Sequence, residues 1–161
     1  MRHDTAPTAL GVKIVTGAFL VVTVVLLGLS YRYGGGLLVV GSILAVISVI
    51  CYVGSPVAYD ISNHVLTVLF PAGSKEFGPI VACKKVPGKF GMTLRLWGNS
   101  GLFSGTGIYW NRKWGIFRAY VTTSDRAVLV LVETPTHKVL VSPADSQLFV
   151  DDAITGSSAD S

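Results

Sequence analysis

Two uncharged apolar runs near the N-terminus constrain the fold of this chain more than any other feature of its sequence. Residues 14–30 and 37–53 are rich in Val, Leu and Ile, and no charged side chain occurs from residue 14 to residue 31. As an α-helix, each run would extend about 26 Å, enough to cross a thin bilayer core. Only helices and closed barrels can cross lipid, and the chain lacks the repeats that build a barrel. The sequence therefore predicts a transmembrane hairpin of two helices over residues 12–54.

Three consecutive glycines at residues 34–36 separate the two runs and predict a tight reversal between antiparallel helices. Gly41, Ala45 and Ser48 fall on one face of the second helix, where small side chains allow close helix packing. We expect this face to pack against the first helix, and the alternative is a dimer interface. A cleaved signal peptide is not expected, because the first run is long and a second run follows directly.

The flanking charges predict the orientation of the hairpin. Two spans place both termini on the same side, and the connecting turn carries a single cation, Arg32. The other side carries Arg2, Lys13 and a basic domain, so the positive-inside rule predicts that both termini are cytoplasmic. Cys51 lies in the second run and Cys83 in a predicted strand, so no disulfide is expected.

The rest of the chain has the alternating pattern of a β domain, predicted over residues 55–154. Ser142 and Pro143 resemble the start of a helix that continues to about Ile154, and Gly98 to Gly107 is expected to be a glycine-rich loop. Residues 1–11 are expected to be mobile, and residues 155–161 disordered. Strands are predicted at residues 57–62, 65–70, 80–86, 93–97, 114–122, 127–133 and 138–142.

Three segments of this domain resemble motifs of a known family. Residues 95–103 (RLWGNSGLF) resemble an R-L-aromatic-G-x-x-G-L-F motif, and residues 115–122 (GIFRAYVT) resemble a G-x-aromatic-R-A-Y-x-T strand. Residues 139–145 (VLVSPAD), followed by Phe149, are similar to a V-I-S-P-x-D ending with a later Phe. These motifs resemble those of bacterial pleckstrin-homology-like (PH-like) domains found beside membrane hairpins. The resemblance implies a mainly-β PH-like barrel of about seven strands with one C-terminal helix, held at the bacterial cell membrane.

Charge is distributed unevenly over the domain. Residues 75–118 carry eight Lys or Arg and one acid, whereas residues 119–161 carry two basic and six acidic side chains. Each cation near an anionic membrane surface contributes about 1 kcal/mol of attraction. The alternative is a solvated face, in which Arg118 pairs with Asp60 or Glu133. The predicted basic face, for anionic lipid headgroups or a protein partner, consists of Lys84, Lys85, Lys89, Arg95, Arg112, Lys113 and Arg118.

Aromatic side chains in and after the glycine-rich segment form a second predicted site. Trp and Tyr suit the membrane–water interface, and such a loop can also contact a protein partner. The alternative is an aromatic cluster that fills the barrel or its mouth. The interfacial aromatic residues are Phe103, Tyr109, Trp110 and Trp114.

The sequence offers little for catalysis. His3, His64 and His137 are scattered, no G-x-S-x-G motif occurs, and the glycine spacing matches neither a P-loop nor a dinucleotide fingerprint. We expect no catalytic residues, no cofactor and no metal. Basic and aromatic residues can bind nucleic acid, but a membrane anchor makes that role uncommon, so no nucleic-acid partner is expected.

These observations predict a non-enzymatic, membrane-anchored PH-like module at the cytoplasmic face of the membrane. Its partners are expected to be membrane proteins, a second copy of the chain, or anionic lipid. The alternative is a structural accessory subunit of a larger membrane complex that acts mainly through its transmembrane hairpin. A transporter or membrane-embedded enzyme would need ionisable groups that face a pathway inside the spans, and the interiors of the two runs contain no Asp, Glu, His, Lys or Arg.

Overall fold

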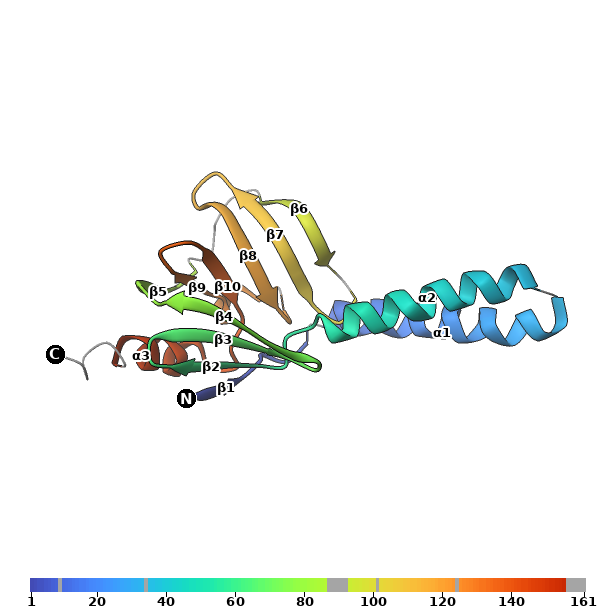
Figure 1. Ribbon diagram of the computed structural model, residues 1–161, viewed down its shortest axis with the longest axis horizontal. Coiled ribbons are helices and arrows are strands. Elements are labelled where there is room, and N and C mark those ends of the chain that lie inside the picture. Colours follow the sequence, from blue (N-terminus) through green and yellow to red (C-terminus); the bar gives the residue numbers. More distant parts are fainter. Residues whose placement is uncertain (9, 34, 87–92, 101, 124, 156–161) are drawn as a thin grey trace.

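A long helical hairpin projects from a β-rich domain in the computed structural model of the chain (Figure 1). The structure describes residues 1–8, 10–33, 35–86, 93–100, 102–123 and 125–155. The hairpin consists of α1 (Leu10–Tyr33) and α2 (Gly35–Val53), which are long and apolar enough to cross a membrane by length and composition. Only 6% and 11% of their apolar windows are buried, so they are not the core helices of a globular domain.

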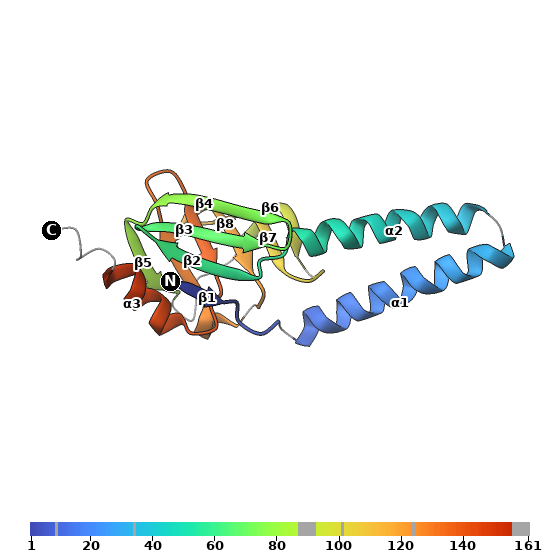
Figure 2. The same ribbon diagram turned by 60° about the horizontal axis from the view of Figure 1, so that its bottom comes forward.

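The hairpin packs closely at Gly41. A Cβ atom at this position would lie 2.7 Å from Leu27 Cδ2 in α1, so a larger residue would push the helices apart. Gly41 of the predicted packing face therefore contacts the first helix of the same chain. On the same face, Ala45 is half-buried and Ser48 is buried, with its hydroxyl donating to the Leu44 carbonyl at 2.9 Å. Figure 2 shows the two helices diverging towards the domain.

The described residues of the domain form two sheets and a C-terminal helix, α3 (Ser146–Thr155). The smaller sheet has the order β1-β2-β3-β4 and the larger sheet the order β5-β9-β10-β8-β7-β6. All neighbouring strands are antiparallel except β10 and β8, which are parallel. The smaller sheet consists of β1 (Arg2–Asp4), β2 (Ala58–Ser62), β3 (Val65–Phe70) and β4 (Gly73–Pro79). The larger sheet consists of β5 (Ala82–Lys85), β6 (Thr93–Ser100), β7 (Gly105–Asn111), β8 (Gly115–Val121), β9 (Val130–Glu133) and β10 (Lys138–Val141).

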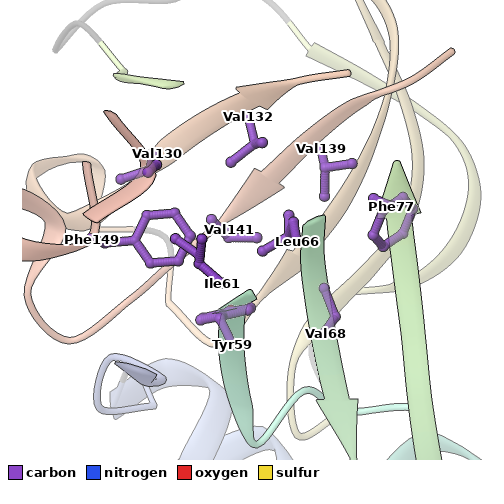
Figure 3. Close-up of a cluster of buried hydrophobic side chains, with 11 residues drawn as sticks. Tyr59, Ile61, Leu66, Val68, Phe77, Val130, Val132, Val139, Val141 and Phe149 are labelled. Atoms are coloured by element: carbon purple, nitrogen blue, oxygen red, sulfur yellow. The ribbon is translucent and has the colours of Figure 1, made fainter. Parts of the chain in front are cut away.

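The main core lies between the two sheets, and α3 closes one end of it with Phe149 and Ala153 (Figure 3). Alternation along the strands explains the core, because every second residue of β2, β3, β9 and β10 points inwards. A second cluster lies on the other face of the larger sheet. The main core comprises Tyr59, Ile61, Leu66, Val68, Phe77, Val130, Val132, Val139, Val141, Phe149 and Ala153. The second cluster comprises Val86, Trp114, Phe117, Ala119, Leu129, Leu131 and Leu140.

The N-terminal segment corrects the expectation that residues 1–11 are mobile. Strand β1 pairs with β2, with His3 opposite Tyr59. The buried His3 ring packs edge-on against Phe149, and its Nε2 atom lies 3.0 Å from Asp152 Oδ2. Too few side chains of this N-terminal segment point into the core for its sequence to show the alternating apolar pattern of a strand. Because β1 precedes α1 and β2 follows α2, the hairpin is an insertion between two paired strands (Figure 2).

The predicted glycine-rich loop from Gly98 to Gly107 is also wrong, because most of it belongs to β6 and β7. Gly98 and Gly107 face each other across the two strands and have φ values of +121° and +156°. A Cβ atom at Gly98 would lie 2.2 Å from the Thr106 carbonyl oxygen, and one at Gly107 would lie 2.1 Å from that of Trp97. These glycines allow a close approach of two backbones rather than a turn.

Three further boundaries differ from the sequence prediction. Strand β4 was not predicted because Phe77 is its one buried side chain, and Arg126–Val128 forms a 3-10 turn instead of the start of a strand. The described residues therefore form ten strands rather than about seven.

Helix α3 begins at Ser146 and is capped by Asp145, whose Oδ1 accepts from the N–H groups of Leu148 and Gln147. These bonds lower the pKa of Asp145. Thr155 ends α3, and residues 156–161 of the predicted tail lie outside the described residues.

Candidate functional site

A basic pocket of about 470 Å³ opens on the outer face of the larger sheet, beside the turn between β7 and β8. Strands β5 and β10 and the turn between β7 and β8 place lysines around its rim, and β9 contributes Leu131 and Glu133. Trp114 and Leu131 line its inner wall. We call this site the distal basic pocket. Its lining consists of Lys84, Lys85, Val86, Lys113, Trp114, Leu131, Glu133 and Lys138.

Cations dominate the distal basic pocket, with four ammonium groups and one carboxylate in its lining. Lys84 Nζ lies 2.8 Å from Glu133 Oε1, and Lys138 Nζ donates to the Trp114 carbonyl oxygen at 3.0 Å. Within the described part of the chain, Lys113 is exposed and forms no ion pair. Lys85 lies opposite Val130 of the main core, and its charge helps to lower the pKa of Asp145. Lys113 can therefore meet an anionic group without first breaking an internal salt bridge.

The distal basic pocket lies far from the helical hairpin. Strand β7 begins directly after Ser104, whose hydroxyl lies 2.9 Å from that of Ser55 just beyond α2. The strand then runs for seven residues, about 20 Å, before it reaches the turn that carries Lys113. Figure 1 shows this turn and β5 on the side of the domain opposite the hairpin.

The structure divides the basic face that the sequence predicts. Lys84, Lys85 and Lys113 line the distal basic pocket, and Arg112 is exposed in the adjacent turn. Arg95 lies on edge strand β6, at the opposite end of the sheet from β5. Lys89 lies outside the described residues.

Arg118 occupies a different environment from the one expected. The register pairs Arg118 with Val139 of the main core, so it lies on the inner face of the sheet. The expected pairing with Asp60 or Glu133 is wrong within the described residues. Asp60 lies 3.4 Å from the N-terminal ammonium group, and Glu133 pairs with Lys84.

Sequence reasoning missed Lys138. Its partner in the strand register is Glu133, across the short connection between β9 and β10. Side chains alternate between the two faces along β9 and β10. Lys138, one residue before Val139, therefore lies on the same face as Leu140 and Leu131. The signal was therefore present in the sequence, but it required the pairing of these two strands.

The predicted aromatic site does not form a single loop. Trp114 is buried and contacts the Phe117 ring edge-on at 5.5 Å, and Tyr109 stacks on Phe117 at 5.8 Å. These two side chains pack in the second core cluster, on the outer face of the larger sheet, whereas the alternative interpretation expected them in the barrel or its mouth. Trp110 is partly exposed on the opposite face of the same sheet.

Phe103 is the member of this aromatic set that contacts the hairpin. Its ring packs edge-on against Tyr52 of α2 at 5.5 Å, and its N–H donates to Thr16 Oγ1 of α1 at 3.0 Å. The backbone at Phe103 is left-handed, with φ of +62°. Residues 102–104 therefore bridge the two helices where they diverge, and they hold the domain against the base of the hairpin.

The match to known proteins falls on the domain just described. A family model described as the bacterial PH domain matches residues 61–154, which is more than half of the 161-residue chain. The chain belongs to the bacterial PH domain family. No curated protein and no solved structure matches the chain.

The match places the distal basic pocket entirely inside the PH domain. The matched residues begin within β2 and end within α3, whereas β1 and both helices of the hairpin precede them. This chain therefore adds an N-terminal strand and a helical hairpin to the region that defines its family.

The buried titratable groups of this PH domain are held in their neutral forms. Burial raises the pKa of the Cys83 thiol to about 12 and that of the Tyr59 hydroxyl to about 12. Cys83 is thus a thiol rather than a nucleophilic thiolate at neutral pH. In the described part of the chain, no group of three His, Cys, Asp or Glu side chains is placed to hold a metal ion.

Proposed function

We propose that the protein is a non-enzymatic, membrane-anchored PH-like module that docks an acidic segment of a protein partner in the distal basic pocket. The observation that supports this function is an exposed lysine without an ion pair, Lys113, in a pocket with an excess of lysines at the end of the domain remote from the hairpin. An acidic side chain of the partner can meet Lys113 and the neighbouring lysines of the pocket.

The position of the pocket favours a protein over the module's own bilayer. The turn that carries Lys113 lies a strand length of about 20 Å from the hairpin, whereas charges in solution are screened over about 8–10 Å. Attraction between Lys113 and headgroups around α1 and α2 is therefore weak. The lipid contact that the sequence suggests for Lys84, Lys85 and Lys113 is accordingly the less favoured proposal.

The hairpin supplies the anchor in this proposal. Both helices have the length and apolar surface of transmembrane spans, and both return the chain to the same domain. The single Arg32 at the turn, against Arg2, Lys13 and the basic domain at the other end, favours a cytoplasmic domain in a bacterial cell membrane.

A structural accessory subunit is the alternative proposal. Leu27 of α1 packs against Gly41 of α2, so a helix from a partner protein would need another face of the hairpin. Gly17 and Gly28 of α1 have open space beside them and offer such a face. Substitution of both by Leu would abolish complex formation through the hairpin while leaving acidic ligands of the PH domain bound.

The test is binding of polyglutamate to the full chain in phosphatidylcholine nanodiscs. We expect salt-sensitive binding that weakens by up to about fivefold for Lys113→Gln. The matched control is Arg95→Gln, which removes one exposed cation at the other end of the same sheet and is expected to bind like the wild type.

Two results would contradict this proposal. The first is binding that the Lys113→Gln variant retains at wild-type strength. The second is an equal loss in Arg95→Gln, which would indicate a general effect of charge. A parallel sample with phosphatidylglycerol vesicles added to the nanodiscs shows whether the same lysines prefer a second membrane over the acidic peptide, which would replace the protein partner with lipid.

A further inference from the structure

A larger cleft, of about 670 Å³, lies where the domain meets the hairpin. One end is formed by Val53 and Gly54, at which α2 ends. One side is the hairpin of β3 and β4, which contributes Phe70 and Lys75, and the other side is the inner face of β6, β7 and β8. We call this site the proximal cleft.

The proximal cleft exists because the smaller sheet covers only part of the larger one. Tyr120 of β8 is covered, since its ring lies 5.7 Å from that of Phe70 and 5.5 Å from that of Phe77. Two and four residues earlier on the same face, Arg118 is half-buried and Ile116 is 64% exposed. Figure 1 shows β6, β7 and β8 spreading away from β4.

The side chains of the proximal cleft combine apolar surface with positive charge. Phe70, Ile108 and Tyr120 supply the apolar surface, and Lys75 and Arg118 supply a cation from each side. No Asp or Glu occurs among its described lining residues. The cleft therefore suits a ligand that carries both an anionic group and an apolar part.

The same face continues to the sheet edge with aromatic surface. The register places Trp97 beside Ile108, and Ile108 beside Arg118, in one row across β6, β7 and β8. Trp97 is 78% exposed, which is unusual for so large an aromatic side chain. Tryptophan is the side chain most suited to the boundary between headgroups and hydrocarbon.

The position of the proximal cleft identifies the source of such a ligand. Val53 and Gly54 belong to the end of the span that enters the domain, so the cleft opens where α2 would leave the bilayer. Cations at that level lie within one Debye length of the headgroups, unlike those of the distal basic pocket.

We propose that the proximal cleft binds one anionic phospholipid from the surrounding leaflet. Its phosphate lies between Lys75 and Arg118, and its glycerol and upper acyl carbons lie against Phe70 and Ile108. A volume of about 670 Å³ is within the range of sites that hold small ligands. The proposal rests on the membrane anchoring in the proposed function, but it is independent of the distal basic pocket.

The test is native mass spectrometry of the full chain released from nanodiscs that contain equal amounts of phosphatidylcholine and phosphatidylglycerol. We expect the wild type to retain one phosphatidylglycerol in preference to phosphatidylcholine. Lys75→Gln and Ser74→Glu, both at exposed positions of β4, are each expected to lower this preference about fivefold. The matched control Arg112→Gln removes a cation from the distal turn and is expected to keep it.

Three outcomes would overturn the lipid site. These are equal retention of the two lipids, an equal loss in Arg112→Gln, and displacement of phosphatidylglycerol by soluble glycerol phosphate, which would assign the cleft to a phosphate compound in solution. Alkaline extraction of the membrane fraction, without nanodiscs, tests the membrane anchor separately from the lipid site. Release of the chain by alkali would refute the anchor itself.

Discussion

At the scale of single residues, the Tyr59 hydroxyl group connects the two sheets. It donates to the Tyr120 carbonyl oxygen at 2.6 Å and accepts from the Ser142 N–H at 3.2 Å. Ser142 Oγ in turn accepts from the Thr122 N–H, and the Thr122 hydroxyl donates to the Ala6 carbonyl oxygen. A fully buried polar group is tolerated here because its hydrogen bonds are satisfied.

Tyr59→Phe should lower the free energy of unfolding by about 1–3 kcal/mol, because it leaves the buried Tyr120 carbonyl and Ser142 N–H without this partner. Thermal unfolding of the full chain in detergent measures the change. Tyr31→Phe is the matched control, since Tyr31 is 99% exposed, and it should leave stability unaltered. Equal stability of Tyr59→Phe and wild type would mean that the hydroxyl contributes nothing net.

Alkaline pH provides a second readout of the same residue. The folded protein raises the pKa of Tyr59 from 10.0 to about 12, so this stabilisation is complete below pH 10 and is lost as pH rises towards 12. Tyr59→Phe should therefore lose less stability than wild type across this interval. Identical alkaline profiles for the two proteins would contradict the assignment.

Prediction of single residues from the sequence succeeded where local composition determines the role of a residue. It failed where a contact partner distant in the chain determines that role. The sequence identified Lys84 and Lys113, which share one pocket, but joined them to Lys85 and Arg118, which the register places on the other face of the sheet. It also assigned the helix cap to Ser142, whose hydroxyl instead accepts from Thr122. Such partners come from strands distant in the chain, and local patterns do not specify them.

At the scale of elements, β6 and β7 depend on glycine for their pairing. Gly98 and Gly107 lie directly opposite each other, and each occupies backbone conformations that other residues rarely adopt. Glycines are typical of loops, so the glycine-rich sequence of these two strands predicted a loop at this position. A local composition rule cannot distinguish a glycine that turns the chain from one that admits a neighbouring strand.

Gly98→Ala should destabilise the domain by about 1–3 kcal/mol, because the new methyl group would strike the Thr106 carbonyl and the backbone would be strained. Gly78→Ala in β4 is the matched control, since nothing lies within 4 Å of its added Cβ, and it should change stability by less than about 0.5 kcal/mol. Denaturant unfolding monitored by tryptophan fluorescence compares the two. Similar effects of both substitutions would show that the close approach of the two backbones at Gly98 does not explain the loss.

At the scale of the whole molecule, the domain encloses both ends of the hairpin. Before α1, the chain contributes β1 and the bridge between Thr5 and Pro143. After α2, it continues directly into β2, and residues 102–104 brace both helices. The sequence predicted the hairpin and the β domain as separate parts, because polar N-terminal residues give no apolar period from which β1 could be inferred.

A domain that begins at residue 57 should be less stable than one that retains β1. Joining residues 1–5 to residues 57–161 by a short Gly-Ser turn is feasible, since Thr5 Oγ1 lies 3.4 Å from the Val57 carbonyl oxygen. The joined form should have the higher melting temperature, because it keeps His3 against Phe149 and Asp152. Equal melting temperatures would mean that β1 adds nothing to the domain, and hydrogen exchange in β2 would locate any difference.

The pairing of β1 with β2 also sets an order of events during synthesis in a membrane. In the membrane-anchored form that we propose, β1 leaves the ribosome before either helix, and its partner β2 appears only after both helices have crossed the bilayer. A molecule that inserted only one helix would leave β1 and the PH domain on opposite sides of the membrane. The core residues Tyr59 and Phe149 would then lack the cover that β1 provides. Completion of the domain thus reports that both crossings have occurred, and quality-control proteases that recognise exposed core can remove the chains that fail.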